Sequence, residues 1–481
     1  MRLKKILKDV EIISTKNFKN YNIKSITHIS NDVIGGGMFI CIKGANFDGN
    51  DYIDDAISKG AKCIITETDV SCGVTVVVVK DIRKTMSIIA KNFYNRCVDS
   101  LKLVGIVGTS GKTTTSLIIG NILSKIDNNI GIIGTNGIFI GNIKISNKFT
   151  TPDPIDLHYI FYQMKSLGVK TIVMEVSAQA ISLKKLYGIK FDICVFTNIT
   201  QEHLDFFDSM EKYVRCKMDF FDKQNMRECV INIDDFYGRE LAYKTNVPCI
   251  SYGVKSPANS FAIDIQSGLQ KLKFTANILD DIMLVDTSLI GDFNVYNLLA
   301  GMTVAKMLGV DAKDILSSVN SMSQIPGRLN VFEKDDKTVI VDFAHTPDSF
   351  EKTLSFLRQF VLGKLYVIFG CVGYSDKQKR MDMGLIANKY SDSIILTTDN
   401  RDFVNFEDIC KDIKIEITKE CTQIEDRKTA IIKALEERKE NDVLVILGKG
   451  DEDYQITKNG YEPYEQDINI VKNYLKGARI K

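Results

Sequence analysis

The sequence predicts an α/β protein of three domains: a central domain with a mainly parallel sheet, a smaller α/β domain before it and a Rossmann-like domain after it. The chain has 481 residues, the length of about three domains. Apolar, β-branched runs alternate with apolar residues at helical spacing, as in parallel sheets. A glycine-rich segment joins one such run to one such helix.

The first domain, residues 1–98, shows strand and helix patterns but no reactive cluster. The patterns predict a loop entering a strand at 32–44, a helix followed by a strand at 50–67, and a buried strand at 74–79. Ser30, Gly44 and Asp48 lie in turn-like segments, where turn chemistry alone can account for them. We therefore expect a binding module and no reaction centre.

The central domain, residues 99–325, begins with GIVGTSGKTTT at Gly105–Thr115. A strand pattern precedes this segment and a helical pattern follows it, which is the context of a phosphate-binding loop. Lys112 would reach the β- and γ-phosphates and the Thr113 hydroxyl would hold Mg²⁺, so we expect a P-loop-type ATPase domain. The strict P-loop pattern requires glycine at Ile106, and a glycine-rich turn with a surface lysine is the alternative.

Polar side chains follow two further strands of the central domain. Glu175 lies at the end of one strand, where a carboxylate near phosphates can hold a metal, although a solvated residue or a cap is the simpler explanation. The second strand leads into a polar loop with His203, a metal-site candidate or a surface histidine. Lys217 follows on a helix and is, on composition alone, a surface lysine. Asn297 lies near the start of a later helix.

The third domain, residues 326–481, follows a boundary rich in proline, glycine and charge. Four strand patterns there each end in a polar loop, and ligands of open α/β sheets bind beyond the carboxyl ends of strands. The loops place these residues where a substrate site is expected: Asp342, His345, Arg380, Asp399, Asn400, Lys449 and Glu452. Turn residues that only solubilise the loops are the alternative.

The composition excludes several classes of protein. The net charge is +1 and the chain has no dense basic run, so a nucleic-acid partner is not expected. The 11 cysteines are scattered without a C-x-x-C pair, which fits reduced thiols and neither a zinc site nor a disulfide framework. No stretch is long enough to span a bilayer, so we expect a cytoplasmic protein with no membrane partner.

Several segments, taken in order, resemble the Mur ligase family, and most closely its MurE type, the UDP-N-acetylmuramoyl-tripeptide synthetases. GTSGKTTT resembles the family's ATP loop, and TTPDP at Thr150–Pro154 resembles the segment that binds the UDP-muramoyl substrate. The other matching segments are MEVSAQA, FTNITQEHLD, the lysine of RCKMDFF, GDFNVYN, PGR and VDFAHTPD. The ordered set covers nearly the whole chain.

The resemblance implies an ATP-dependent, ADP-forming amide ligase of peptidoglycan precursor synthesis. The carboxylate of UDP-N-acetylmuramoyl-L-alanyl-D-glutamate would attack ATP to give an acyl phosphate, which the amine of an incoming amino acid would then attack. ATP and Mg²⁺ are the implied cofactors, because charge on two phosphorylated species must be neutralised. The UDP-muramoyl dipeptide and an amino acid are the implied partners, and we expect a monomer.

The resemblance also assigns residues to sites. The catalytic set would be Lys112, Glu175, His203 and a carbamylated Lys217. Mg²⁺ would be held by Thr113, Glu175, His203 and Lys217. ATP would contact Gly108, Thr109, Ser110, Gly111, Lys112, Thr113, Thr114, Asn297, Arg328 and Asp342. The UDP substrate would contact Ser30, Thr150, Thr151, Ser177 and Lys185. The amino acid would contact Arg380, Asp399, Asn400, Arg401, Gly448 and Glu452.

The chain departs from the family pattern mainly at its substrate motifs. The usual serine-histidine is Ala178-Gln179, an expected arginine is Lys185, and Asp-Ser-Arg is Ile29-Ser30-Asn31. Asp-Asn-Pro-Arg is Asp399-Asn400-Arg401-Asp402, and Gly-Lys-Gly-His-Glu has Asp451 for histidine. The identity of the added amino acid, diaminopimelate, lysine or another, therefore stays open. A paralogue that ligates an amine to a different carboxylate, and a catalytically silent nucleotide-binding protein, are the alternatives.

Overall fold

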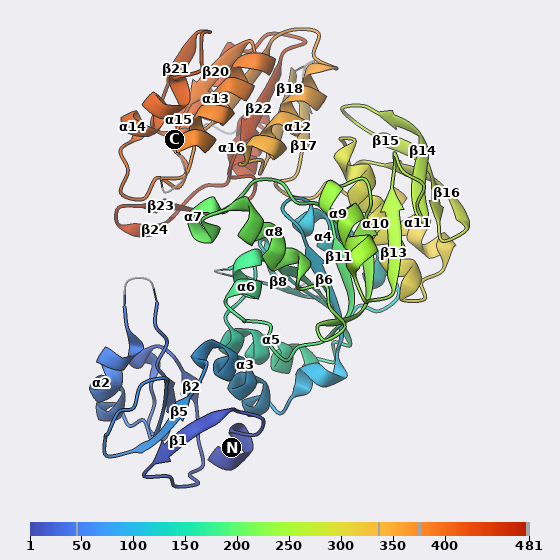
Figure 1. Ribbon diagram of the computed structural model, residues 1–481. Helices are drawn as coiled ribbons and strands as arrows, with labels where there is room; N and C mark the ends of the chain where they lie inside the picture. The colour runs from blue at the N-terminus through green and yellow to red at the C-terminus, as the bar shows by residue number, and fades with distance from the viewer. Residues whose placement is uncertain (45–46, 142, 148, 335–336, 374–376, 478–481) are drawn as a thin grey trace.

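The computed structural model describes residues 1–44, 47–141, 143–147, 149–334, 337–373 and 377–477 (Figure 1). Three large sheets follow one another along the described chain, and a two-stranded sheet lies near its end. We call the elements from β6 to α11 the central unit and those from β17 to α16 the third unit. Part of the polar loop expected after the strand that ends at Phe369, residues 374–376, lies outside the described residues.

The first sheet has the strand order β1-β5-β4-β3-β2, with only β1 antiparallel to its neighbour. Its strands are β1 (Ile12–Lys16), β2 (Ile26–Thr27), β3 (Met38–Ile40), β4 (Cys63–Thr66) and β5 (Thr75–Val79). Its helices are α1 (Leu3–Ile6), η1 (Ser30–Asp32), η2 (Gly49–Tyr52), α2 (Ile53–Ser58), α3 (Ile82–Phe93) and η3 (Cys97–Ser100). Helix α3 connects this part to the central unit, since the Ser87 hydroxyl donates to Lys184 O (2.8 Å) and Lys91 Nζ to Gly188 O (2.7 Å).

The central sheet has the order β16-β15-β14-β13-β12-β11-β6-β10-β7-β8-β9. The pairs from β14 to β7 are parallel and those at both edges are antiparallel, so the predicted mainly parallel sheet is confirmed. Its strands are β6 (Lys102–Val107), β7 (Ile130–Gly134), β8 (Gly137–Ile140), β9 (Ile143–Ile145), β10 (Thr171–Val176), β11 (Phe191–Phe196), β12 (Met226–Asn232), β13 (Cys249–Gly253), β14 (Ser260–Ser267), β15 (Leu272–Ile278) and β16 (Asp281–Thr287).

Helices cover both faces of the parallel part because its strands are apolar on both sides. In β6, Val104 and Ile106 pack into one core while Leu103 and Val107 pack into the other. The helices of the unit are α4 (Lys112–Ser124), α5 (Pro154–Ser166), α6 (Ala178–Ser182), α7 (Leu204–Phe207), α8 (Met210–Met218), α9 (Phe236–Lys244), α10 (Phe293–Met307) and α11 (Ala312–Asn320).

The third unit contains a second sheet with helices on both faces, with the order β17-β18-β22-β19-β20-β21. Its four central strands are the four predicted ones, and all pair in parallel. The strands are β17 (Asn330–Lys334), β18 (Lys337–Asp342), β19 (Leu365–Phe369), β20 (Ser393–Leu396), β21 (Cys421–Gln423) and β22 (Val443–Leu447), with a separate hairpin β23 (Tyr454–Thr457) and β24 (Gly460–Pro463). The helices are α12 (Pro347–Arg358), α13 (Lys377–Tyr390), α14 (Phe406–Lys414), α15 (Arg427–Glu437) and α16 (Asp467–Leu475).

The predicted fold class, α/β with three sheet-based parts, is confirmed, while the boundaries at 98/99 and 325/326 stay predictions. Each of the eleven cysteines is a free thiol. Among the described residues, no helix has the length and apolar character needed to cross a membrane.

Candidate active site

A cavity of about 940 Å³ opens between the carboxyl ends of the central strands and the third unit. Loops that follow β6, β10, β11, β18 and β22 line it, together with the start of α10. These predicted site residues lie on its wall: Gly108, Thr109, Ser110, Gly111, Lys112, Thr113, Thr114, Thr150, Thr151, Glu175, Ser177, Lys185, His203, Lys217, Asn297, Arg328, Asp342 and Glu452. The sequence-based set therefore comes together mainly at one place.

The glycine-rich loop wraps tightly around the N-terminus of α4. Gly111 caps this helix with φ +84°, and a Cβ there would lie 2.4 Å from Asn297 Oδ1. A Cβ on Gly108 would lie 1.8 Å from Thr197 Oγ1, so both positions require glycine. The Lys112 ammonium donates to Gly108 O (2.9 Å) and Thr109 O (2.8 Å), across the space that the loop encloses. The surface-lysine alternative is therefore wrong.

Glu175 is buried, and its carboxylate closes the base of the loop region. One oxygen accepts from Thr135 N (2.9 Å) and the other from Thr135 Oγ1 (3.1 Å). The Thr135 hydroxyl also contacts the Thr150 hydroxyl (3.0 Å), which connects the carboxylate to the predicted substrate segment. Each carboxylate oxygen keeps a lone pair for a cation. The solvated-residue explanation of Glu175 is wrong.

Lys217 is buried, with 1% of its surface exposed, so it is not the surface lysine that composition alone suggests. Its ammonium lies 3.1 Å from Thr109 Oγ1, contacts the Tyr213 hydroxyl, and stands 4.1 Å above the centre of the Tyr213 ring. Among the described residues it forms no ion pair. Burial, followed by repulsion from Lys112, lowers the pKa of Lys217 well below its usual value. A lowered pKa favours the uncharged amine, which is the form that reacts with CO₂ to give a carbamate.

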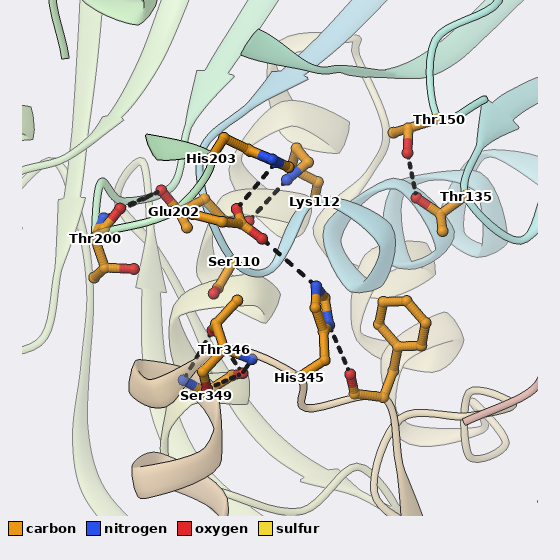
Figure 2. A network of polar contacts seen from close by, with 12 residues as sticks. Ser110, Lys112, Thr135, Thr150, Thr200, Glu202, His203, His345, Thr346 and Ser349 are labelled. Carbon is orange, nitrogen blue, oxygen red and sulfur yellow. Dashed lines mark hydrogen bonds and ion pairs between the residues drawn. The ribbon is translucent and has the colours of Figure 1, made fainter. Parts of the chain in front are cut away.

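His203 lies in the left-handed backbone region, with φ +56° and ψ +31°, immediately before α7. Its Nδ1 lies 3.1 Å from Gln179 Nε2. Burial lowers the pKa of His203, against the attraction of Glu202. Glu202 was not among the predicted site residues, although an acidic residue directly before a loop histidine could have indicated it. Figure 2 shows its carboxylate between His203 and His345.

Arg328 connects the third unit to the phosphate-binding loop. Its guanidinium donates to Thr113 Oγ1 (3.2 Å) and lies 4.3 Å from the centre of the Phe343 ring, while its buried Nε has no partner among the described residues. Asp342 holds the adjoining turn, since its oxygens accept from Leu329 N (2.8 Å) and Ala344 N (2.9 Å). Burial raises the pKa of Asp342. Leu329 has φ +44°, so this turn is strained.

The residues predicted for the UDP substrate divide into two groups. Four line the cavity: the Thr151 hydroxyl donates to Glu175 O (2.9 Å) and accepts from Ser177 N (3.0 Å), Thr150 contacts Thr135, and Lys185 pairs with Asp153 (2.7 Å). Ser30 lies apart from the cavity, in η1 of the first sheet.

The residues predicted for the amino acid also divide. Asp399, Asn400 and Glu452 surround the buried Lys449, whose ammonium lies 2.9 Å from Glu452 Oε2, 3.1 Å from Asn400 Oδ1 and 3.9 Å from Asp399 Oδ1. Gly448 adjoins this cluster, because a Cβ there would lie 2.8 Å from Asp399 Oδ2. Burial opposes ionisation of Asp399, but Lys449 and Arg427 lower its pKa. Only Glu452 of the predicted set reaches the cavity wall.

The two predicted arginines of the third unit point to other carboxylates. The buried Arg380 guanidinium pairs with Asp412 of α14 (2.8 Å) and donates to Val372 O (3.3 Å). Arg401 pairs with Glu425 (2.6 Å). Neither lies on the cavity wall, so an arginine role in amino-acid recognition stays a prediction.

The donor set suits Mg²⁺, which prefers oxygen ligands. A hydroxyl, Thr113, and a buried carboxylate, Glu175, face the cavity beside the loop, and a carbamate on Lys217 would add oxygen donors on the same wall. Among the described residues, no group of three His, Cys, Asp or Glu side chains forms a metal site. The roles of Thr113, Glu175, His203 and Lys217 as metal ligands therefore stay predictions.

Three family models match the chain: the Mur ligase catalytic domain over 22–94, the Mur ligase middle domain over 106–305 and the Mur ligase glutamate ligase domain over 327–450. The UDP-N-acetylmuramoyl-L-alanyl-D-glutamate–2,6-diaminopimelate ligase of Caldanaerobacter subterraneus subsp. tengcongensis is 38% identical over 481 residues, 99% of each chain.

The ligase of the same name from Clostridioides difficile is 38% identical over 464 residues, which cover 95% of this chain and 96% of that one. A solved structure with this ligase name has a TM-score of 0.71 and 25% identity, with 100% of both chains covered. The chain belongs to the Mur ligase family.

Proposed function

We propose that this chain is an ATP-dependent, ADP-forming ligase that adds an amino acid to UDP-N-acetylmuramoyl-L-alanyl-D-glutamate in peptidoglycan precursor synthesis. The observation that carries the proposal is the single cavity in which a phosphate-binding loop, Glu175, His203 and a buried Lys217 face residues of the third unit. The names of full-length relatives at 38% identity support the substrate. Because the reaction uses soluble nucleotides, we place it in the cytoplasm. We also propose that the protein acts as a monomer.

In the proposed reaction the substrate carboxylate attacks the γ-phosphorus of ATP, which releases ADP and leaves an acyl phosphate. The amine of the amino acid attacks the acyl carbon, and phosphate departs with one former carboxylate oxygen. Lys112 and the N–H groups of the loop hold the transferred phosphoryl group. Thr113, Glu175, His203 and a carbamylated Lys217 would hold Mg²⁺, which neutralises charge on the phosphorylated species.

The third unit completes this site. Arg328 reaches Thr113 from the turn at the start of the unit, and Asp342 orders that turn. Covering the loop in this way excludes water from an acyl phosphate, which would otherwise hydrolyse. Thr150, Thr151, Ser177 and Lys185 lie on the opposite wall, where we place the muramoyl substrate.

The test is formation of ADP and of a new UDP-linked peptide, measured with ATP, UDP-N-acetylmuramoyl-L-alanyl-D-glutamate and a panel that includes diaminopimelate and lysine. We expect ADP only when nucleotide substrate and one amino acid are both present, and a product heavier by that amino acid less water. Lys112→Ala should abolish product, whereas Lys125→Ala, an exposed lysine after the same helix, should not. Equal ADP release without the UDP substrate would refute the proposal.

A second candidate is a paralogue that ligates an amine to another carboxylate. The specific observation is that neither Arg380 nor Arg401 faces the cavity, while Lys185 and Asp451 replace the residues expected in the substrate motifs. Silence across the panel, with ATP still bound, would favour this candidate.

A further inference from the structure

Glu202 contacts one histidine from each of two units. It lies in the loop after β11, and its Oε2 is 3.5 Å from His203 Nε2 in the same loop. Its Oε1 is 3.5 Å from Nε2 of His345, which lies in the loop after β18 of the third unit (Figure 2). Only 12% of the Glu202 side chain is exposed, so protein groups supply most of its surroundings.

The His345 ring lies between two acceptor oxygens. Its Nδ1 lies 2.9 Å from Phe343 O, and its Nε2 lies 3.5 Å from Glu202 Oε1. An imidazole can donate to acceptors at both nitrogens when it is protonated. Other charged groups that act on this pair are Asp399, in the loop after β20, together with Lys112 and Lys217 of the central unit.

The His203 ring meets Glu202 differently. Its Nδ1 lies 3.1 Å from the Gln179 amide nitrogen, and its Nε2 lies 3.5 Å from Glu202 Oε2. Glu202 therefore lies between a histidine of its own unit and a histidine of the third unit. Burial alone would raise the pKa of Glu202, but hydrogen bonding with His345 and the nearby positive charges lower it.

Other polar contacts across this interface involve at least one neutral partner. Arg328 reaches the Thr113 hydroxyl, and the Asn136 amide donates to Asp451 Oδ2 (3.0 Å). Within the described part of the chain, Glu202–His345 is the only close contact between an acidic and a basic side chain that joins the central and third units. A charge pair that is largely shielded from water depends strongly on both partners, because removal of one leaves the other unpaired.

We propose that Glu202 and His345 are positioning residues that form a latch between the loop after β11 and the third unit, while the second oxygen of Glu202 holds the His203 ring. The latch does not depend on which carboxylate or amino acid the protein uses, because both of its residues belong to the chain. The position of the third unit and the orientation of the His203 ring therefore both depend on the Glu202 side chain.

The test is hydrogen–deuterium exchange of the full-length protein without substrates, so that its outcome is independent of the ligase reaction. We expect Glu202→Gln to speed exchange of segment 343–350 in the third unit, and His345→Gln to speed exchange of segment 197–207 in the central unit, each by roughly tenfold. The matched control is Glu351→Gln, which removes a pair with Lys389 inside the third unit and should leave 197–207 unchanged.

Two further variants separate a latch from a general loss of structure. His345→Lys supplies a cationic donor at the same position and should retain most of the protection of 197–207 that His345→Gln loses. The double variant Glu202→Gln/His345→Gln should exchange no faster than the faster single variant, because both remove the same contact. Faster exchange confined to the segment that carries the substitution, or additive effects in the double variant, would overturn the proposal.

Discussion

The buried histidine His158 of α5 should make the protein sensitive to mild acid. Its side chain is fully buried, and neither ring nitrogen has a hydrogen-bond partner among the described residues. The ring packs edge-on against Phe161, 5.7 Å between centres. Burial, with a contribution from Lys91, lowers the pKa of His158 from 6.5 to about 3.

The sign and size of the effect follow from proton linkage. Above pH 6.5 the imidazole is neutral in both the folded and unfolded chains, so its contribution is unchanged. As the pH falls from 6.5 toward 3, only the unfolded chain binds the proton, and folding loses about 1.4 kcal/mol per pH unit. At pH 5.0 the loss amounts to about 2 kcal/mol from this residue.

The variant His158→Leu replaces the titratable imidazole with an apolar side chain of similar volume. Relative to the unchanged protein, it should gain about 2 kcal/mol more stability at pH 5.0 than at pH 7.5, which is roughly 4–8 °C in the unfolding midpoint of a unit of this size. Calorimetric unfolding of both proteins at the two pH values measures this, since the other titrating groups cancel in the comparison. Parallel pH dependences would refute the reasoning.

The remaining predictions concern the site and the core of the third unit. Gly111→Ala places a Cβ against Asn297 at a left-handed position, so ADP affinity measured by calorimetry should fall at least about tenfold; unchanged affinity would contradict the tight loop. Lys217→Ala should lose ligase activity, and added short carboxylates should partly restore it. Lys212→Ala, which changes an exposed lysine of the same helix, should remain active. If no concentration of carboxylate restored the activity of Lys217→Ala, a carbamate would be contradicted. Arg427→Met breaks a fully buried bidentate pair with Asp467 and should destabilise the third unit by about 3–5 kcal/mol in denaturant unfolding, because it leaves the Asp467 charge unpaired. The double variant Arg427→Met/Asp467→Leu removes that charge and should lose less stability. A larger loss in the double variant than in Arg427→Met would contradict this reasoning.

Much of the fold was accessible from the sequence because its strands are continuous apolar runs. The strand before Gly108 and those of the third unit are buried on both faces, and such runs stand out between polar loops. The antiparallel edge β14–β16 was not predicted separately. Its strands have one solvated face, so buried and exposed residues alternate along them, as in β15. This alternation is a weaker sequence signal than a continuous apolar run.

The candidate site was predictable where a residue follows a strand and not where burial comes from distant segments. Glu175 and His203 follow strands, so their place at the sheet edge could be predicted. The burial of Lys217 could not, because Thr109 and Tyr213 enclose it and its own helix carries charged residues. The contact between Glu202 and His345 could not be predicted either, because the two residues lie in loops of different units.

The measurement that tests the central claim most directly follows the oxygen atoms. The glutamate carboxylate of UDP-N-acetylmuramoyl-L-alanyl-D-glutamate would be labelled with ¹⁸O and the released phosphate analysed by mass spectrometry, with the amino acid that supports turnover. Because the acyl phosphate breaks at its carbonyl carbon, each phosphate should carry one labelled oxygen for each amide bond formed. Unlabelled phosphate, with label retained in the carboxylate, would show hydrolysis of ATP by water and would contradict the account.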